Sequence, residues 1–94
     1  MANRTRFLRE LVQGIRAEVP GLGIGVRLSA VDFLPYRPDP EQSDADTLGP
    51  GIPVDASAAL PYRYGFGIDE QDPNQISLEE TAQFLQVLTE LDIP

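Results

Sequence analysis

Hydrophobic residues near the start of the chain recur at spacings of one, three and four: Phe7, Leu8, Leu11, Val12 and Ile15. This spacing predicts an amphipathic helix over residues 3–18, with Asn3 as its N-cap. Arg9 and Arg16 fall outside the apolar face and are expected to point into solvent. Pro20 and Gly21 then end the helix in a tight turn.

A short apolar run follows this turn directly. Residues 23–29 are predicted to form a strand covered on both faces, as in a parallel sheet. Arg27 is the one charged residue in it. A buried guanidinium keeps its charge and needs an acceptor, so carbonyl or anionic oxygens should face Arg27. Because α/β proteins bind ligands at the carboxyl ends of parallel strands, Arg27 is the first candidate for a binding residue.

The remainder divides into an irregular stretch and a second helix. Residues 30–76 contain seven of the nine Pro and no sustained periodicity, which predicts a long loop. Residues 77–91 form the second predicted helix, because Ser77 and Glu80 have the spacing of a capping box ahead of an apolar stripe.

The predicted order is therefore helix, strand, long loop, helix. One strand cannot make a sheet, because its backbone donors and acceptors need neighbouring strands. Each helix also needs a surface for its apolar face. The pattern thus indicates a section of a larger α/β protein, with obligate assembly of copies as the alternative. Whether copies form a homo-oligomer stays open.

Composition narrows the function classes. With 41% hydrophobic residues and a mean hydropathy of −0.19, the 94-residue chain is typical of a soluble globular domain. No stretch resembles a membrane span or the apolar core of a signal peptide, so no membrane association and a cytoplasmic setting are expected. The sequence contains no Cys and no His, which excludes a disulfide framework, a thiolate nucleophile and an imidazole base.

The net charge of −8 is distributed unevenly. Residues 1–30 carry five Arg against two Glu, whereas residues 31–94 carry two Arg against thirteen acids. This acidity argues against nucleic acid as a partner for the larger part of the chain. The Arg residues of the first helix are therefore interpreted as its solvated face.

Two groups of side chains in the long loop are weaker candidates. One is acidic and has oxygen ligands that suit a hard cation such as calcium, although a solvated loop is the favoured interpretation: Asp39, Glu41, Asp44 and Asp46. The other is aromatic: Tyr36, Tyr62, Tyr64 and Phe66. These rings could close the mouth of an active site, pack on a neighbouring subunit, or anchor the loop to its own domain.

Three stretches carry a resemblance to a known family. NRTRFLRELVQGIRAEV, followed by VRLSA and Asp32-Phe33, resembles the segment of the NADH:flavin oxidoreductases, or Old Yellow Enzyme family, that reads ENR-x-RF, a helix, then VRLS or VRVS. SLEETAQFLQVLTELDIP is similar to the helix that follows in that family. The loop between them, with PYRPDP and PYRYGFGID, resembles an extended loop of one bacterial branch.

The resemblance implies that the chain is an internal fragment of a (β/α)8 TIM barrel. In that family FMN lies at the carboxyl ends of the strands, is reduced by NADH or NADPH, and is reoxidised by an activated alkene or another small-molecule acceptor. Arg27 matches the Arg that points at the flavin pyrimidine edge near N1 and the C2 carbonyl. The family's substrate-binding His or Asn and its Tyr proton donor lie on earlier strands, and its phosphate-binding turns come later. The 94 residues by themselves are therefore expected to be inactive.

The resemblance also implies that Met1 and Ala2 stand at an internal or misassigned start.

Other interpretations of the function remain. Arg27 could form a salt bridge inside a barrel, or bind a substrate phosphate or carboxylate in another kind of (β/α) barrel. A different class of function is a small acidic protein-interaction module whose Pro-rich loop binds a partner.

Overall fold

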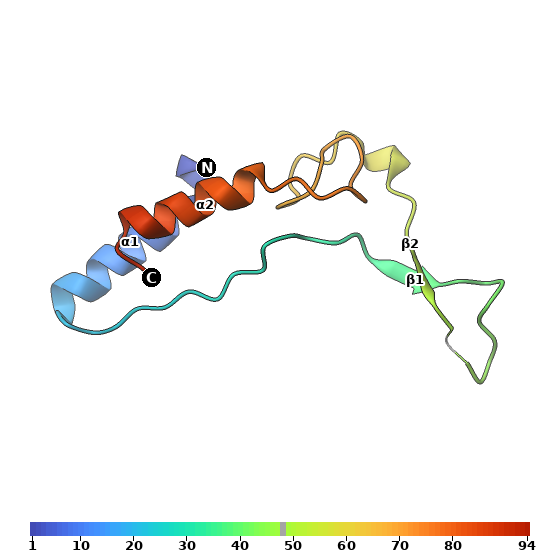
Figure 1. The fold of residues 1–94 in the computed structure, drawn as a ribbon, viewed down its shortest axis with the longest axis horizontal. Coiled ribbons are helices and arrows are strands. Elements are labelled where there is room, and N and C mark those ends of the chain that lie inside the picture. The colour runs from blue at the N-terminus through green and yellow to red at the C-terminus, as the bar shows by residue number, and fades with distance from the viewer. Residues whose placement is uncertain (48) are drawn as a thin grey trace. The chain divides into compact units, whose positions relative to one another are not determined.

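The computed structural model describes residues 1–47 and 49–94 and has mixed α/β content. Its elements are, in chain order, α1 (Ala2–Glu18), β1 (Tyr36–Pro38), β2 (Gly51–Pro53), the 3-10 helix η1 (Ser57–Ala59) and α2 (Glu79–Glu90) (Figure 1). They belong to two compact units. The helical unit comprises Met1–Ala30 and Leu78–Pro94, and the loop unit comprises Val31–Ser77.

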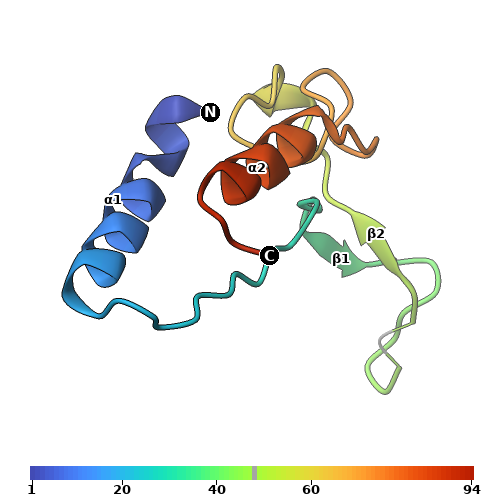
Figure 2. The same cartoon turned by 60° about the vertical axis from the view of Figure 1, so that its left-hand side comes forward.

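The helical unit contains α1 and α2, seen in Figure 2 as the blue and the red helix, and side chains from both contribute to one buried cluster. Val12 of α1 is only 1% exposed. It belongs to a buried cluster with residues at the end of α2 and just beyond it: Val87, Leu88, Leu91 and Ile93. Only part of the predicted apolar face of α1 takes part, since Leu8 is half-buried whereas Phe7 is 76% exposed. The core therefore covers one side of the predicted stripe.

Arginine side chains of α1 reach across to α2. Arg4 Nη1 donates to both carboxylate oxygens of Glu80 at 2.9 and 2.8 Å. Arg9 Nη2 lies 2.8 Å from Glu90 Oε2. Farther along, Arg16 donates to a backbone carbonyl just after α2. The contacts progress in the same order along both helices, so α1 and α2 run in the same direction. Arg4 and Arg16 are exposed, as the interpretation of a solvated face expects, but acidic partners on α2 also attract Arg4 and Arg9.

Neither predicted N-cap is formed. Helix α1 already begins at Ala2, so Asn3 lies inside it. Helix α2 begins at Glu79 with Leu78 at the N-cap and no capping bond from a side chain. The carboxylate of Glu80 binds Arg4 instead of folding back on its own helix. A charge-assisted pair between helices thus replaces the local capping box.

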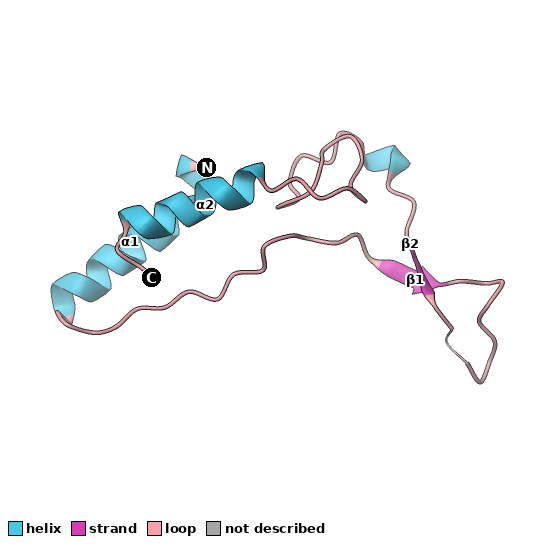
Figure 3. Cartoon of the chain, in the orientation of Figure 1, coloured by secondary structure: helices cyan, strands magenta, loops and turns pink. Residues whose placement is uncertain are grey.

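The predicted strand over residues 23–29 is not formed as a strand. Figure 3 draws this part of the chain as loop, and its N–H groups donate to no described backbone carbonyl. The prediction assumed neighbouring strands, and none of the described residues lies in register with this segment. One end is fixed, because the buried hydroxyl of Thr81 donates to the Ala30 carbonyl at 2.6 Å. We refer to residues 23–30 as the unpaired segment.

The loop unit coincides with the predicted long loop, but it contains regular structure. β1 and β2 pair antiparallel, with Arg37 opposite Ile52. An isolated bridge joins Ile68 and Ile76, and the side chain of Leu34 is buried within the unit. Turns are stabilised by aspartates whose carboxylates accept backbone N–H groups two or three residues later: Asp39, Asp44, Asp55, Asp69 and Asp72. Pairing and turn chemistry together order a stretch that lacks periodicity.

Candidate functional site

The first candidate site is the face of the unpaired segment that carries Arg27. Ile24 and Val26 pack against the core of the helical unit. Residues on the alternate positions, Gly25, Arg27 and Ser29, are exposed. Burial thus alternates with period two, as along a strand with one covered face. Arg27 lies on the face opposite the helices.

The surroundings of Arg27 differ from the predicted ones. The residue is exposed rather than buried, and its guanidinium forms no hydrogen bond or ion pair with any described residue. Its neighbours on the same face are small: a Cβ placed on Gly25 would meet no atom within 4 Å, and Ser29 carries only a hydroxymethyl group. The expected acceptor therefore does not come from the described part of the chain. The open face leaves a flat group room to approach the five guanidinium donors.

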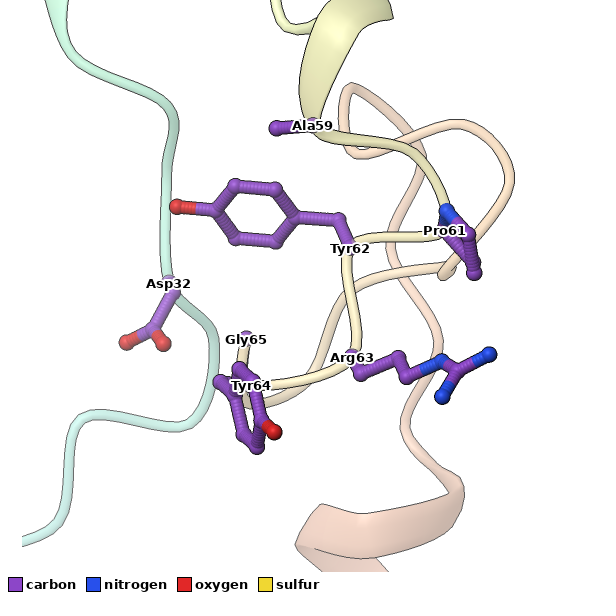
Figure 4. Close-up of a pocket in the computed structure, with 7 residues that line it drawn as sticks. All are labelled: Asp32, Ala59, Pro61, Tyr62, Arg63, Tyr64 and Gly65. Carbon is purple, nitrogen blue, oxygen red and sulfur yellow. The ribbon is translucent and has the colours of Figure 1, made fainter.

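A second candidate site is a pocket of about 340 Å³ within the loop unit (Figure 4). It is lined by Asp32, Ala59, Pro61, Tyr62, Arg63, Tyr64 and Gly65. One wall comes from the start of the unit and the other from the run that follows η1. In Figure 4 the ring of Tyr62 points towards the stretch that carries Asp32, whereas the guanidinium of Arg63 points away from it.

Hydrogen bonds hold the two walls of this pocket together. The Asp32 N–H donates to the Phe66 carbonyl at 2.7 Å, and Asp32 Oδ2 accepts the Phe66 N–H at 2.8 Å. Gly65 permits a close approach beside them, since a Cβ there would lie 2.5 Å from Ile68 Cδ1 and 3.1 Å from Tyr62 Cδ1. The pocket is therefore shaped by backbone contacts as well as by its aromatic rings.

The aromatic candidates do not all gather at this pocket. Tyr62 is half-buried and Tyr64 is 91% exposed, and both line it. Phe66 contributes its backbone to the bonds with Asp32. Tyr36 belongs to β1 and is not among the lining residues. Sequence reasoning thus identified two of the lining rings. It missed Asp32, which follows the VRLSA run after one intervening residue, because the hydrogen bond that brings Asp32 to the pocket joins residues 34 positions apart.

The acidic candidates have structural roles in turns. Asp39 accepts the N–H of Glu41, and Asp44 accepts the N–H of Asp46. Within the described residues, no three acidic side chains converge in a way that could hold a metal ion. The calcium interpretation of this loop therefore gains no support, and the carboxylates serve as turn-forming acceptors.

One acidic turn has a perturbed carboxyl group. The hydroxyl and N–H of Ser57 both donate to Asp55, which lowers the pKa of that carboxyl below its ordinary value. Hydrogen bonding favours the charged form in this way. Asp55 is outside the lining of the pocket, so this shift concerns the turn before η1.

Comparisons with known proteins give no assignment. No family model, no curated protein and no solved structure matches this chain. No helix among the described residues combines the length and apolar character needed to cross a membrane.

Proposed function

We propose that this chain is a section of a cytoplasmic FMN-dependent NAD(P)H oxidoreductase of the Old Yellow Enzyme type. In this proposal the unpaired segment is one strand of a (β/α)8 barrel, α1 and α2 are the helices before and after it, and Arg27 binds the flavin. The sequence resemblance is the origin of the proposal. Alternating burial along the unpaired segment is the observation that carries it furthest.

That alternation suits a barrel strand. Ile24 and Val26 face the helices, and Arg27 lies on the opposite face, which would be the barrel interior. Arg27 is also near the carboxyl end of the segment, the end at which barrels bind their ligands. The same direction of α1 and α2 is a further point in favour, because successive helices of a β/α repeat run parallel to each other.

The residues around Arg27 fit a planar ligand that carries hydrogen-bond acceptors. Its guanidinium offers a fork of donors, and the neighbouring Gly25 leaves space beside it. When bound, FMN would accept hydride from NADH or NADPH and pass it to an activated alkene or another acceptor. Arg27 would hold a positive charge beside the ring oxygens on which negative charge develops, and would thereby stabilise the reduced anion.

The test uses the complete protein that contains this chain. Arg27→Ala is compared with Arg27→Lys and with Arg6→Ala, which removes the same charge from an exposed position of α1. Loss of a hydrogen bond to a charged group costs about 1.5–3 kcal/mol, so flavin affinity or the rate of flavin reduction should fall about 10- to 100-fold in Arg27→Ala. Arg27→Lys should restore part of the loss. Equal affinity and equal reduction rates in Arg27→Ala and Arg6→Ala would exclude the assigned role.

A second candidate is a small acidic protein-interaction module. The observation in its favour is that Val31–Ser77 forms a compact unit with its own pairing and turns. This alternative predicts that the 94-residue chain is a cooperatively folded monomer, with a heat-capacity peak and dispersed amide resonances. A third interpretation, a different (β/α) barrel in which Arg27 binds a phosphate or carboxylate, is separated from the first by the visible absorption of flavin in the complete protein.

A further inference from the structure

We propose that the pocket of the loop unit binds an organic cation, either a guanidinium or an alkylammonium group. The pocket combines one carboxylate, from Asp32, with the rings of Tyr62 and Tyr64 (Figure 4). Rings and a carboxylate are the two kinds of group that attract such cations. The site lies within the loop unit and does not involve Arg27, so the proposal is independent of the flavin assignment.

The charge of the loop unit favours a positive ligand. Residues 31–77 contain nine Asp or Glu and two Arg. Asp32 is the acidic member of the pocket lining. Its Oδ2 accepts the Phe66 N–H, and no described residue donates a hydrogen bond to its Oδ1. One carboxylate oxygen is therefore available to a ligand at a position that is fixed by the backbone.

The tyrosines supply the second attraction. Tyr62 is half-buried, with its ring directed towards the stretch that carries Asp32, and Tyr64 exposes almost its whole ring. A cation over such a ring gains about 0.5–1 kcal/mol at an exposed site, which corresponds to roughly two- to fivefold in affinity. Arg63 also lines the pocket, but its guanidinium points away from Asp32. Its charge is therefore directed away from the proposed binding position.

The dimensions limit the ligand to a small group. Ligand pockets usually have volumes of about 300–1,000 Å³, and this one, at about 340 Å³, is at the lower end. It suits the head of a side chain or a small amine rather than a nucleotide. Two sources share this chemistry: an Arg or Lys side chain of a peptide, and a free organic cation.

The test is an NMR titration of the full chain with Nα-acetyl-arginine amide. The neutral analogue Nα-acetyl-citrulline amide, which has nearly the same shape, is the matched control. Resonances of Tyr62 and Tyr64 should shift with a dissociation constant of roughly millimolar size, as expected for a small ligand with few contacts. The citrulline probe should produce shifts only at much higher concentration.

Variants separate the local carboxylate from the overall charge. Asp32→Asn retains an oxygen that can accept the Phe66 N–H, and should weaken binding of the arginine probe about two- to fivefold. Asp46→Asn changes the net charge equally at an exposed position outside the pocket, and should leave the affinity unchanged. Tyr64→Leu removes an exposed ring without disturbing a core and should also weaken binding.

Two further probes distinguish the sources. Tighter binding of an Arg-centred tripeptide than of agmatine supports the proposal with a peptide as the source, whereas equal affinities support it with a free cation. Equal shifts from the arginine and citrulline probes would overturn the proposal. So would equal affinities of Asp32→Asn and Asp46→Asn for the arginine probe.

Discussion

Two substitutions in α1 test how much of its apolar face the chain covers by itself. Val12 is 1% exposed, within the cluster that includes Val87, whereas Phe7 is 76% exposed. Val12→Ala removes two methyl groups, each worth about 0.8 kcal/mol of transfer free energy. With the cavity that remains, we expect the free energy of unfolding to fall by about 2 kcal/mol.

The larger side chain should matter less. Only about a quarter of the Phe7 surface is buried, so Phe7→Ala removes about 0.5 kcal/mol of favourable transfer free energy. Alanine's higher helix propensity offsets most of that amount, since the scale spans about 0.7 kcal/mol for ordinary residues. The net change should therefore be close to zero, although a fully buried Phe→Ala typically costs about 3–5 kcal/mol.

If the 94-residue chain unfolds cooperatively, as the interaction-module alternative predicts, its equilibrium urea unfolding followed by circular dichroism measures both changes. If Phe7→Ala lowered the free energy of unfolding as much as Val12→Ala does, the assignment of the core would be refuted. The same pair in the complete protein tests the barrel proposal separately. If another part of that protein covers Phe7, Phe7→Ala should there cost about 3 kcal/mol or more.

Three further outcomes are expected. Arg4→Glu should lower the free energy of unfolding, and the added Glu80→Arg should recover part of the loss, with a coupling of about 0.2–1 kcal/mol that shrinks with salt in a double-mutant cycle. Gly49→Ala should disorder the turn between β1 and β2, because Gly49 has φ +60° and an added Cβ would meet a backbone carbonyl. Amide chemical shifts in both strands should then change, and an unchanged spectrum would contradict this expectation. Because the pKa of Asp55 is lowered, its carboxylate stabilises the fold above the unfolded-state pKa, and this stabilisation is lost as the pH falls through the folded-state pKa. In Ser57→Ala the Asp55 carboxyl should titrate at higher pH in an NMR titration. An unaltered titration midpoint would contradict the assigned cause.

Local sequence patterns predicted the helices well and their caps poorly. The helical spacing of hydrophobic residues predicted both helices to within two residues of their observed bounds. The predicted capping box at Ser77 and Glu80 is not formed, because the Glu80 carboxylate binds Arg4, 76 residues away. Contacts of such sequence separation lie outside any window of local reasoning.

For the candidate sites too, local sequence signals were predictable, whereas contacts between residues distant in sequence were not. Arg27 was identified as the one charge in an apolar run, but its predicted burial required strands that the described chain does not provide. The pocket depends on hydrogen bonds between Asp32 and Phe66, which are 34 residues apart. The aromatic run around Tyr62 and Tyr64 was visible in the sequence, whereas its carboxylate partner was not.

The hydrogen bond from Thr81 to the Ala30 carbonyl has a consequence for how such a chain can change during evolution. It joins, at 2.6 Å, the last residue before the loop unit to the beginning of α2, just after that unit. The unpaired segment and α2 would therefore need only a short turn between them if Val31–Ser77 were deleted. The loop unit is in this sense a removable insertion, which can lengthen, shorten or acquire a new ligand while the helices and Arg27 keep their places.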